Sequence, residues 1–361
     1  MPIPGRNFRR ILIVRLGAMG DVIHGMPAVA ALRAAFPEAQ FGWVIEERWS
    51  DLLQVRGTER VGVLTTKRPL VEAVHFANTH TWRRAPFSDE TWREILGLRR
   101  ELRSTRYDAV VDLQGSMKSA LVANASGAPT RFGFANPRER LATMFYTEVA
   151  NTTAAHVIEQ NLELASAMLH ASRSTVQTWG TTFPQDDAAE EWCTRVLAQH
   201  GIGEFAIINP GAGWGAKCWP AERYAQVAMA LGEMNLPSIV NFGPAEESLA
   251  QSVVEGSAGA AFAIKMALPE LIALTRRAKL FVGGDTGPLH LAAASHVPVV
   301  ALFGPTDPQR NGPYGTRAMV LRSQRSRTSH HRTADPDAGL MSITSEQVIT
   351  AVHTLLEQPN E

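Results

Sequence analysis

The fold class of this chain is indicated by residues Ile11-Leu-Ile-Val-Arg-Leu-Gly-Ala-Met-Gly-Asp-Val-Ile-His24. It opens with a short, continuous apolar run, which is typical of a strand buried on both faces of a parallel sheet. Glycines follow, and from Met26 to Ala35 the apolar residues return at helical spacing. The order of strand, glycine turn and helix predicts a βα unit, and this order recurs along both halves of the chain.

The same patterns predict the other elements. The expected buried strands are Ile11–Val14, Phe41–Ile45, Ala109–Leu113, Ala206–Ile208, Ser238–Phe242, Leu280–Val282 and Val299–Phe303. The expected helices are Met26–Ala35, Trp92–Arg103, Ala188–Gln199, Ala221–Met234, Pro269–Arg277, Pro288–Ala294 and Ser345–Gln358. Strands that alternate with helices predict an α/β fold with two Rossmann-like, doubly wound domains that face each other across a cleft.

Two polar stretches mark the expected domain limits. The apolar periodicity stops in residues 172–185, where Ser, Thr, Gln, Gly and Pro prevail, and a second polar stretch spans 322–337. We expect domains at residues 1–178 and 179–344, followed by a terminal helix in 345–361. The length of 361 residues fits two domains, because a domain typically has about 100–200 residues.

Composition excludes several classes of protein. Lys and Arg number 35, as do Asp and Glu, and the zero net charge argues against a nucleic-acid coat or a polybasic membrane tether. The cysteines, Cys193 and Cys218, lack the spacing of a zinc site and fit a reducing compartment. The first apolar run is shorter than the about 7–15 residues of a secretory signal or the about 18 of a membrane helix. We therefore expect a soluble cytoplasmic protein.

The turn after the first expected strand carries Gly17, Gly20 and Asp21. Its Gly-x-x-Gly spacing differs from the Gly-x-Gly-x-x-Gly turn of dinucleotide-binding domains, which disfavours a nicotinamide enzyme. Asp21 fits two interpretations. It stands where a helix N-cap would, and it also follows the carboxyl end of a strand, where α/β proteins bind ligands and where a catalytic carboxylate could lie.

A second glycine-rich turn, Asn209–Pro220, follows the first strand of the second half and contains Gly213 and Lys217. Backbone N–H groups together with one lysine suit a phosphate group. A P-loop ATPase is excluded, because Cys218 stands where that motif requires Ser or Thr. The alternative is a surface loop with a solvated lysine.

A third turn, Phe281-Val-Gly-Gly-Asp-Thr-Gly-Pro-Leu-His290, again joins a strand to a helix. The backbone N–H groups of Thr286 and Gly287 would open that helix and can bind a pyrophosphate. Asp285 can accept hydrogen bonds from sugar hydroxyls. His290, one turn later, either reaches back to a ligand or packs in the core.

Glu246 and Glu247 close a similar strand and turn, Asn241-Phe-Gly-Pro-Ala-Glu-Glu247. Either carboxylate can bind ribose hydroxyls, as acidic residues do in other nucleotide-binding folds. Both can equally be acids that stabilise a helix N-terminus. The sequence contains no acidic cluster typical of a metal site, so we expect no metal.

Positive charge gathers in the first half of the chain. Residues Trp82–Arg106 contain seven arginines and four acids, and Arg83 and Arg84 are expected in a loop. The planar fork of arginine suits carboxylates and phosphates, although many such residues only form a solvated helix face. Other polar candidates in this half are Gln114, Lys118, Arg138 and Arg140.

Together these motifs resemble those of the ADP-heptose:lipopolysaccharide heptosyltransferases, glycosyltransferase family 9, over most of the chain. The resemblance rests on Arg15–His24, Lys217–Pro220, Asp285–His290 and Phe303-Gly-Pro-Thr-Asp307. Segments most similar to the heptosyltransferase I type are Val44–Glu47, Val111–Ser119 and Arg138–Tyr146, whereas Pro210–Gly213 is more similar to heptosyltransferase II. The family implies the GT-B fold, in which the terminal helix crosses back toward the first domain.

The resemblance also implies roles for individual residues. Asp21 would be the general base of an inverting transfer of L-glycero-D-manno-heptose from ADP-heptose to Kdo, with no metal or other cofactor, and Lys217 would stabilise the diphosphate. The implied residues for binding ADP-heptose are Gly213, Lys217, Glu246, Glu247, Asp285, Thr286, Gly287 and His290. The implied residues for binding the acceptor are Arg15, Gly20, Arg83, Arg84, Gln114, Lys118, Arg138 and Arg140.

The implied acceptor is Kdo-lipid A or inner-core lipopolysaccharide. It implies peripheral contact with the cytoplasmic face of the inner membrane and no nucleic-acid partner. Two alternatives stay open: heptosyltransferase II or another family member with a different acceptor, and a non-catalytic protein that binds nucleotide sugars. A nucleoside-diphosphate-sugar epimerase is disfavoured, because the chain lacks both the Gly-x-Gly-x-x-Gly turn and a Tyr-x-x-x-Lys pair.

Overall fold

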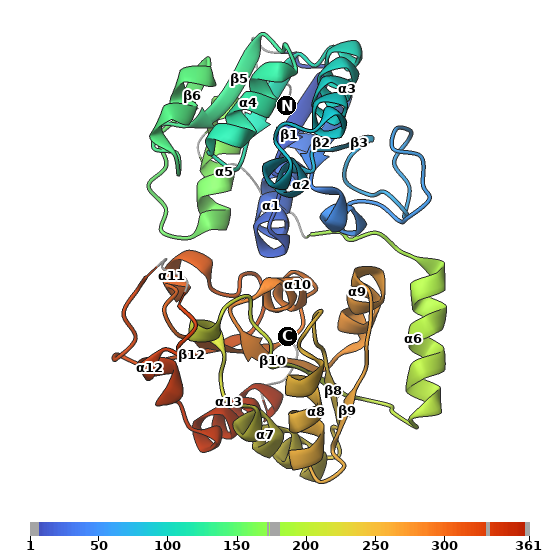
Figure 1. Ribbon diagram of the computed structural model, residues 1–361, viewed down its shortest axis with the longest axis vertical. Helices are drawn as coiled ribbons and strands as arrows, with labels where there is room; N and C mark the ends of the chain where they lie inside the picture. The colour runs from blue at the N-terminus through green and yellow to red at the C-terminus, as the bar shows by residue number, and fades with distance from the viewer. Residues whose placement is uncertain (1–6, 172, 174–180, 330–332, 358–361) are drawn as a thin grey trace. The chain divides into compact units, whose positions relative to one another are not determined.

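The chain divides into two compact units, Met1–Gln185 and Asp186–Glu361 (Figure 1). The computed structural model describes residues 7–171, 173, 181–329 and 333–357. The expected boundary between residues 178 and 179 lies outside the described residues. Each unit is built around one parallel sheet with helices on both faces, which is the doubly wound arrangement predicted from the sequence.

The first unit contains a six-stranded sheet in the order β3-β2-β1-β4-β5-β6. Its strands are β1 (Arg10–Val14), β2 (Gln40–Ile45), β3 (Ala73–Phe76), β4 (Ala109–Asp112), β5 (Thr130–Phe134) and β6 (Glu148–Ala150). Its α-helices are α1 (Met19–Ala35), α2 (Thr79–Arg84), α3 (Asp89–Thr105), α4 (Met117–Ala125) and α5 (Val157–Met168). Two short 3-10 helices are η1 (Glu47–Leu52) and η2 (Arg140–Phe145). Helix α1 packs on α5, and α3 packs beside α4.

The second unit repeats this plan in the order β12-β11-β10-β7-β8-β9. Its strands are β7 (Ala206–Asn209), β8 (Ser238–Val240), β9 (Ala261–Ala263), β10 (Leu280–Gly284), β11 (Val299–Phe303) and β12 (Ala318–Arg322). Its helices are α6 (Asp187–Gln199), η4 (Gly215–Lys217), α7 (Ala221–Glu233), α8 (Glu247–Gly256), α9 (Leu268–Arg277), α10 (Gly287–Ala294), α11 (Pro308–Asn311), α12 (Ala338–Met341) and α13 (Ser345–Glu357). In both units the order reverses beside the first strand, so β1 adjoins β4 and β7 adjoins β10.

The predicted central strands all form, and their burial explains why the sequence shows them clearly. Ile11–Val14 are fully buried, because helices cover both faces of the sheet. No comparable apolar run predicts β3, β5, β6, β9 and β12. All of these except β5 are edge strands, and β12, for instance, is only partly buried, so its residues do not form a continuous apolar run.

Helix α1 begins at Met19, earlier than the start at Met26 predicted from the sequence. Pro27 lies inside the helix, where it removes one backbone hydrogen bond. Val22, Ile23 and Met26 are buried, and their packing outweighs this loss. The helix therefore extends back to the turn after β1 and carries Asp21 on its first turn.

The terminal helix α13 packs on α7, β11 and β12 of its own unit. Its buried face consists of Val348, Ala351, Val352 and Leu355. The passage of this helix toward the first domain stays a prediction. In the part of the chain that the structure describes, no helix combines the length and the apolar character needed to cross a membrane.

A buried hydrogen-bond chain ties β3 to α3 in the first unit. His75 Nδ1 lies 2.8 Å from Glu101 Oε1, and His75 Nε2 lies 2.6 Å from Tyr107 Oη. Burial raises the pKa of Tyr107, so its hydroxyl stays protonated in this contact with Nε2. Gly42 of β2 leaves room for this hydroxyl, since a Cβ at position 42 would lie 1.9 Å from Tyr107 Oη.

Gly42→Ala should therefore destabilise the first unit by about 1–3 kcal/mol, the usual cost of overpacking a core. Urea unfolding measures the change. Gly97→Ala is the matched control, because a Cβ at this helical position meets nothing within 4 Å. Alanine there should raise stability by about 0.5–1 kcal/mol. Equal effects of the two substitutions would contradict the packing described for Gly42.

Candidate active site

Two loops meet where the strand order of the first unit reverses, one after β1 and one after β4. The buried Arg15 guanidinium donates to the backbone oxygen of Leu113, and its Nη2 lies 2.7 Å from Asp21 Oδ1. The backbone N–H of Leu16 donates to Gln114 Oε1 at 2.9 Å. These contacts join Arg15, Asp21 and Gln114 into one group at the carboxyl ends of adjacent strands, the usual ligand site of this fold.

Asp21 is the third residue of α1, so the predicted N-cap position is wrong, but its carboxylate does cap the start of the helix through a capping box. The helix begins two residues earlier, with Ala18 as the cap. The backbone N–H of Ala18 donates to Asp21 Oδ2 at 3.2 Å. The Asp21 side chain keeps 43% of its surface exposed, so an incoming hydroxyl can reach it. Gly20 precedes it in the same turn and is partly buried.

The loop after β4 is organised by Asp112, which the sequence reasoning did not single out. This fully buried carboxylate accepts hydrogen bonds from the backbone N–H groups of Gln114 and Gly115 and from the hydroxyls of Ser119 and Tyr146. Burial raises the pKa of Asp112, and the four hydrogen bonds act against this rise. An aspartate at the end of a buried strand, directly before a glycine turn, was the available signal.

Lys118 joins a second polar group in the first unit. Its Nζ lies 3.4 Å from Thr79 Oγ1, and the Thr79 hydroxyl donates to Glu46 Oε1 at 2.6 Å. Glu46 is buried after β2 and pairs with Arg48 at 2.6 Å. Lys118 is thus placed at the same edge of the sheet as Asp21.

The four predicted arginines lie at the surface. Arg83 and Arg84 end helix α2 and are not in a loop, because α2 extends from Thr79 to Arg84. Arg138 and Arg140 are exposed at the start of η2. In the described part of the chain none of these arginines forms an ion pair with Asp21 or Asp112.

In the second unit, Lys217, Asp285 and His290 form a compact charged group at the corresponding point. Lys217 Nζ lies 2.6 Å from Asp285 Oδ2 and donates to the backbone oxygen of Asp285 at 3.1 Å. His290 Nε2 lies 3.1 Å from Asp285 Oδ1. Burial alone would raise the pKa of Asp285, but His290 and Lys217 together hold this pKa well below its usual range.

The turn that opens α10 lies beside this group. Thr286 is the N-cap of α10, yet its hydroxyl donates to the backbone oxygen of Gly284 at 3.3 Å instead of capping the helix. Asn209 Nδ2 lies 3.4 Å from Thr286 Oγ1, which links the ends of β7 and β10. The backbone N–H groups of Thr286 and Gly287 lie in this partly buried turn, and the N-cap side chain does not form a capping hydrogen bond to the helix.

Glu246 and Glu247 differ in their environment. Glu246 is the N-cap residue of α8, and its Oε2 accepts the N–H of Gly243 at 2.7 Å. It also packs on the loop after β7, since a Cβ at Gly211 would lie 2.2 Å from the same oxygen. Glu247 begins the helix and is exposed. The structure thus brings Glu246, and not Glu247, to the loop that precedes Lys217.

The backbone around Lys217 is held by a distant segment, residues 333–337. A Cβ at Gly215 would lie 1.8 Å from the Ala334 backbone oxygen, so only glycine fits there. The Ala216 N–H donates to Thr333 at 3.3 Å, and the Asp337 N–H donates to the Ala216 oxygen at 3.4 Å. Gly213 is different, because a Cβ there would meet nothing within 4 Å.

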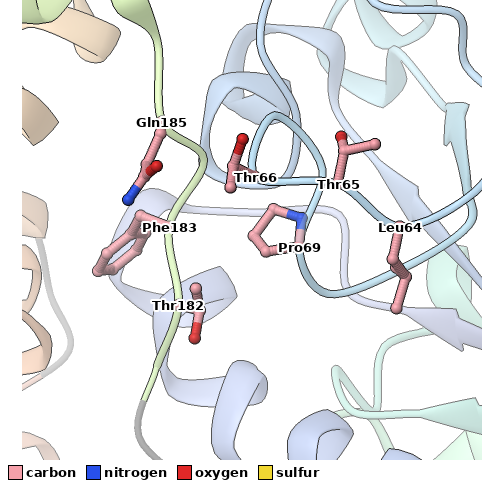
Figure 2. A pocket seen from close by; sticks show the side chains of 7 residues that line it. All are labelled: Leu64, Thr65, Thr66, Pro69, Thr182, Phe183 and Gln185. Atoms are coloured by element: carbon pink, nitrogen blue, oxygen red, sulfur yellow. The ribbon is translucent and has the colours of Figure 1, made fainter.

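One cavity, with a volume of about 270 Å³, lies elsewhere in the first unit. Figure 2 shows its lining: Leu64, Thr65, Thr66, Pro69, Thr182, Phe183 and Gln185. The N–H of Gln185 donates to the Thr66 backbone oxygen at 2.9 Å. Because none of the predicted site residues lines this cavity, we assign it to the anchoring of the chain before α6.

A metal centre is not evident among the described residues. In these ranges no group of three or more His, Cys, Asp or Glu side chains is placed to hold a metal ion. Lys118 and Lys217 are cationic side chains that follow the strand ends of the two units and are available to an anionic ligand.

Two doubly wound domains with charged groups at their strand ends are the architecture of GT-B glycosyltransferases. The model of the family described as glycosyltransferase family 9 (heptosyltransferase) matches residues 95–339, and the chain belongs to this family. Lipopolysaccharide heptosyltransferase 1 of Escherichia coli (strain K12) is 32% identical over 322 residues, which is 88% of this chain and 94% of that protein. These matches confirm the family predicted from the sequence.

Solved structures of a relative agree with the fold. E. coli heptosyltransferase WaaC with ADP has a TM-score of 0.76 and 29% identity, over 96% of this chain and 99% of that one. The same enzyme with ADP-2-deoxy-2-fluoro heptose has a TM-score of 0.75 and 28% identity, over 96% of this chain and 99% of that one. The predicted GT-B fold is confirmed, and the protein is a glycosyltransferase.

The low pKa of Asp285 predicts a pH-dependent contribution to stability. Its folded-state pKa lies below the unfolded value of about 3.9, so the carboxylate stabilises the fold at neutral pH and loses this effect as the pH falls below that value. Asp285→Asn leaves Lys217, whose side chain is only 14% exposed, without its charged partner and should cost about 3–5 kcal/mol at pH 7. The difference from the wild type should shrink in acid.

Urea unfolding without ligand, between about pH 3 and pH 7, measures this difference. Glu247→Gln is the control, because Glu247 is exposed, and it should follow the wild type at every pH. A difference between Asp285→Asn and wild type that stays constant or grows on acidification would contradict the assigned pairing.

Proposed function

We propose that this enzyme transfers L-glycero-D-manno-heptose from ADP-heptose to the Kdo of the lipopolysaccharide inner core, as a heptosyltransferase of type I. The observation that carries the proposal is the pair of charged groups at the strand reversals, Arg15–Asp21 in the first unit and Lys217–Asp285–His290 in the second. The named relatives support it, since they are a lipopolysaccharide heptosyltransferase 1 and a heptosyltransferase crystallised with an ADP-heptose analogue.

Asp21 acts as the general base. It takes the proton from the acceptor hydroxyl, whose oxygen forms a bond to the anomeric carbon of the heptose. The bond from that carbon to the diphosphate oxygen breaks, and its electron pair leaves with ADP, so the configuration inverts. Arg15 Nη2 lies 2.7 Å from Asp21 Oδ1 and fixes the orientation of the carboxylate. The Asp21 side chain nevertheless keeps 43% of its surface exposed to solvent. Arg15 is buried, so its part in acceptor binding is indirect, through the orientation of Asp21.

Lys217 and the first turn of α10 stabilise the diphosphate that leaves. The lysine charge and the N–H groups of Thr286 and Gly287 are positioned before the reaction, which favours the charge that develops on the leaving group. Asp285 accepts hydrogen bonds from heptose hydroxyls. His290 acts by orienting Asp285, whose Oδ1 lies 3.1 Å away.

Glu246 binds the ribose hydroxyls of ADP. Its carboxylate is fixed by the Gly243 N–H, next to the loop after β7 that leads to Lys217. The absence of a side chain at Gly213 lets a ligand approach the backbone of that loop. Glu247 is exposed and has no part in this site.

The acceptor is bound by polar and basic groups of the first unit. Gln114 and Lys118 follow the carboxyl end of β4, at the same edge of the sheet as Gly20 and Asp21. They bind the sugar that carries the attacking hydroxyl. Arg83, Arg84, Arg138 and Arg140 are exposed, and their guanidinium groups suit carboxylates and phosphates. An acceptor anchored in lipid places the enzyme at the cytoplasmic face of the inner membrane as a peripheral protein.

Asp21→Asn should lower kcat by about 10²- to 10⁴-fold, the usual contribution of a general base, with little change in the Kd of ADP-heptose. ADP release with Kdo-lipid A measures kcat, and calorimetry measures Kd. Asp89→Asn, an exposed acid at the start of α3, is the control and should keep full activity. Unchanged turnover of Asp21→Asn would exclude Asp21 as the general base. A wild-type protein that binds ADP-heptose but does not transfer the heptose would support the alternative of a non-catalytic binding protein.

Glu246→Gln should weaken ADP-heptose binding roughly tenfold or more, because a hydrogen bond to a charged group contributes about 1.5–3 kcal/mol. Glu247→Gln is the matched control at the neighbouring position and should leave the Kd unchanged. Calorimetric titration compares the two variants. Equal losses would show that neither carboxylate is specific for the ribose.

A further inference from the structure

Large apolar side chains are exposed in α3 and in the turn before it. Phe87, between α2 and α3, is 91% exposed, and Trp92 and Leu96 of α3 are 52% and 50% exposed. Side chains of this kind are usually buried, so a group of them at the surface marks an interaction site.

The geometry of α3 surrounds these side chains with arginine. Thr91, Leu98 and Leu102 form the buried face of the helix. Trp92 and Leu96 are one turn apart on another face. Residues three or four positions apart are neighbours on a helix surface, so the neighbours of Leu96 are Arg93, Arg99 and Arg100. All three are exposed.

The exposed apolar side chains continue onto the elements that adjoin α3. Helix α4 packs beside α3 (Figure 1), and η2 packs against α4. Leu121 of α4 and Leu141 and Met144 of η2 are exposed, with Met144 at 76%. We call this surface the α3–η2 face; its apolar members are Phe87, Trp92, Leu96, Leu121, Leu141 and Met144.

The charge on this face is positive and largely unpaired. In the described part of the chain, no ion pair involves Arg83, Arg84, Arg93, Arg99, Arg100, Arg138 or Arg140. The acids nearby are Asp89, Glu90, Glu94 and Glu139. Two of them are engaged elsewhere, because Glu94 accepts the Trp82 indole N–H at 2.6 Å and Glu139 accepts the Met117 N–H at 2.9 Å.

We propose that the α3–η2 face docks on the surface of an anionic lipid bilayer. Aromatic and aliphatic side chains interspersed with arginine suit a membrane interface, where apolar side chains enter the acyl boundary and the guanidinium groups meet anionic headgroups. A second copy of the chain is a less suitable partner for this face than a lipid bilayer. A symmetric dimer through this face would oppose two arginine clusters, and such like-charge contacts are unfavourable.

This inference rests on the proposed function for one point, that the acceptor is anchored in lipid. Docking through α3 and η2 keeps Arg83, Arg84, Arg138 and Arg140 beside the headgroups, where a lipid-borne phosphate or carboxylate lies. The face thus serves both to bring the enzyme to its acceptor and to bind the charged part of that acceptor.

The test is sedimentation of the full chain with vesicles of phosphatidylethanolamine and phosphatidylglycerol, compared with vesicles of phosphatidylcholine. We expect binding to the anionic vesicles, reduced by salt. Phe87→Ser/Trp92→Ser/Leu96→Ser should abolish most of it. Arg99→Gln/Arg100→Gln should weaken it about 30-fold, because each arginine near an anionic surface contributes about 1 kcal/mol. Met229→Ser, an exposed apolar residue of the second unit, is the control and should bind normally.

Two further measurements separate this proposal from the proposed function. Transfer to a deacylated, soluble acceptor should be unchanged in the triple serine variant, whereas transfer to the vesicle-embedded acceptor should fall with binding. Unchanged vesicle binding, or a wild-type dimer that this variant dissociates, would overturn the docking proposal. A wild type that binds vesicles but transfers heptose to neither acceptor would leave the docking proposal standing and overturn the proposed function.

Discussion

Each unit carries a cation paired with an aspartate at the point where its strand order reverses. Arg15 meets Asp21 between β1 and β4, and Lys217 meets Asp285 between β7 and β10. A charge removed from water is tolerated only when it is paired and hydrogen-bonded, so these pairs dictate how the surrounding loops fold. Leu113, Gln114 and the turn before α1 are placed by the first pair, and the turn before α10 by the second.

The two pairs are opposite in exposure, and this sets what each can do. In the first unit the cation is buried and the Asp21 carboxylate is 43% exposed. In the second unit the Asp285 side chain is only 7% exposed and is held ionised by Lys217 and His290. An exposed carboxylate can exchange a proton with a bound hydroxyl, whereas an ionised, buried one can only accept hydrogen bonds. The same fold thus places an accessible carboxylate on one unit and a buried, ionised carboxylate on the other.

The sequence predicted what depends on local pattern. Central strands and glycine turns were found because Ile11–Val14 and Phe281–Gly284 are apolar or glycine at every position. Edge strands such as β12 were not predicted, because a half-buried edge strand mixes apolar and polar residues. The start of α1 was missed because the apolar helical spacing was recognised only from Met26, whereas tertiary packing of Val22 and Ile23 extends the helix back to Met19.

Contacts between distant segments could not be read from spacing. Glu246 and Glu247 are neighbours of the same type, and only the folded structure shows that Glu246 binds the Gly243 N–H and approaches Gly211. The hydrogen bond from Tyr146 to Asp112 likewise joins the end of η2 to β4.

One contact between distant segments also limits how this protein can be engineered. Because Ala334 lies directly on Gly215, an insertion, a tag or a proteolytic cut at residues 333–337 would disturb Lys217 as directly as a change in its own loop.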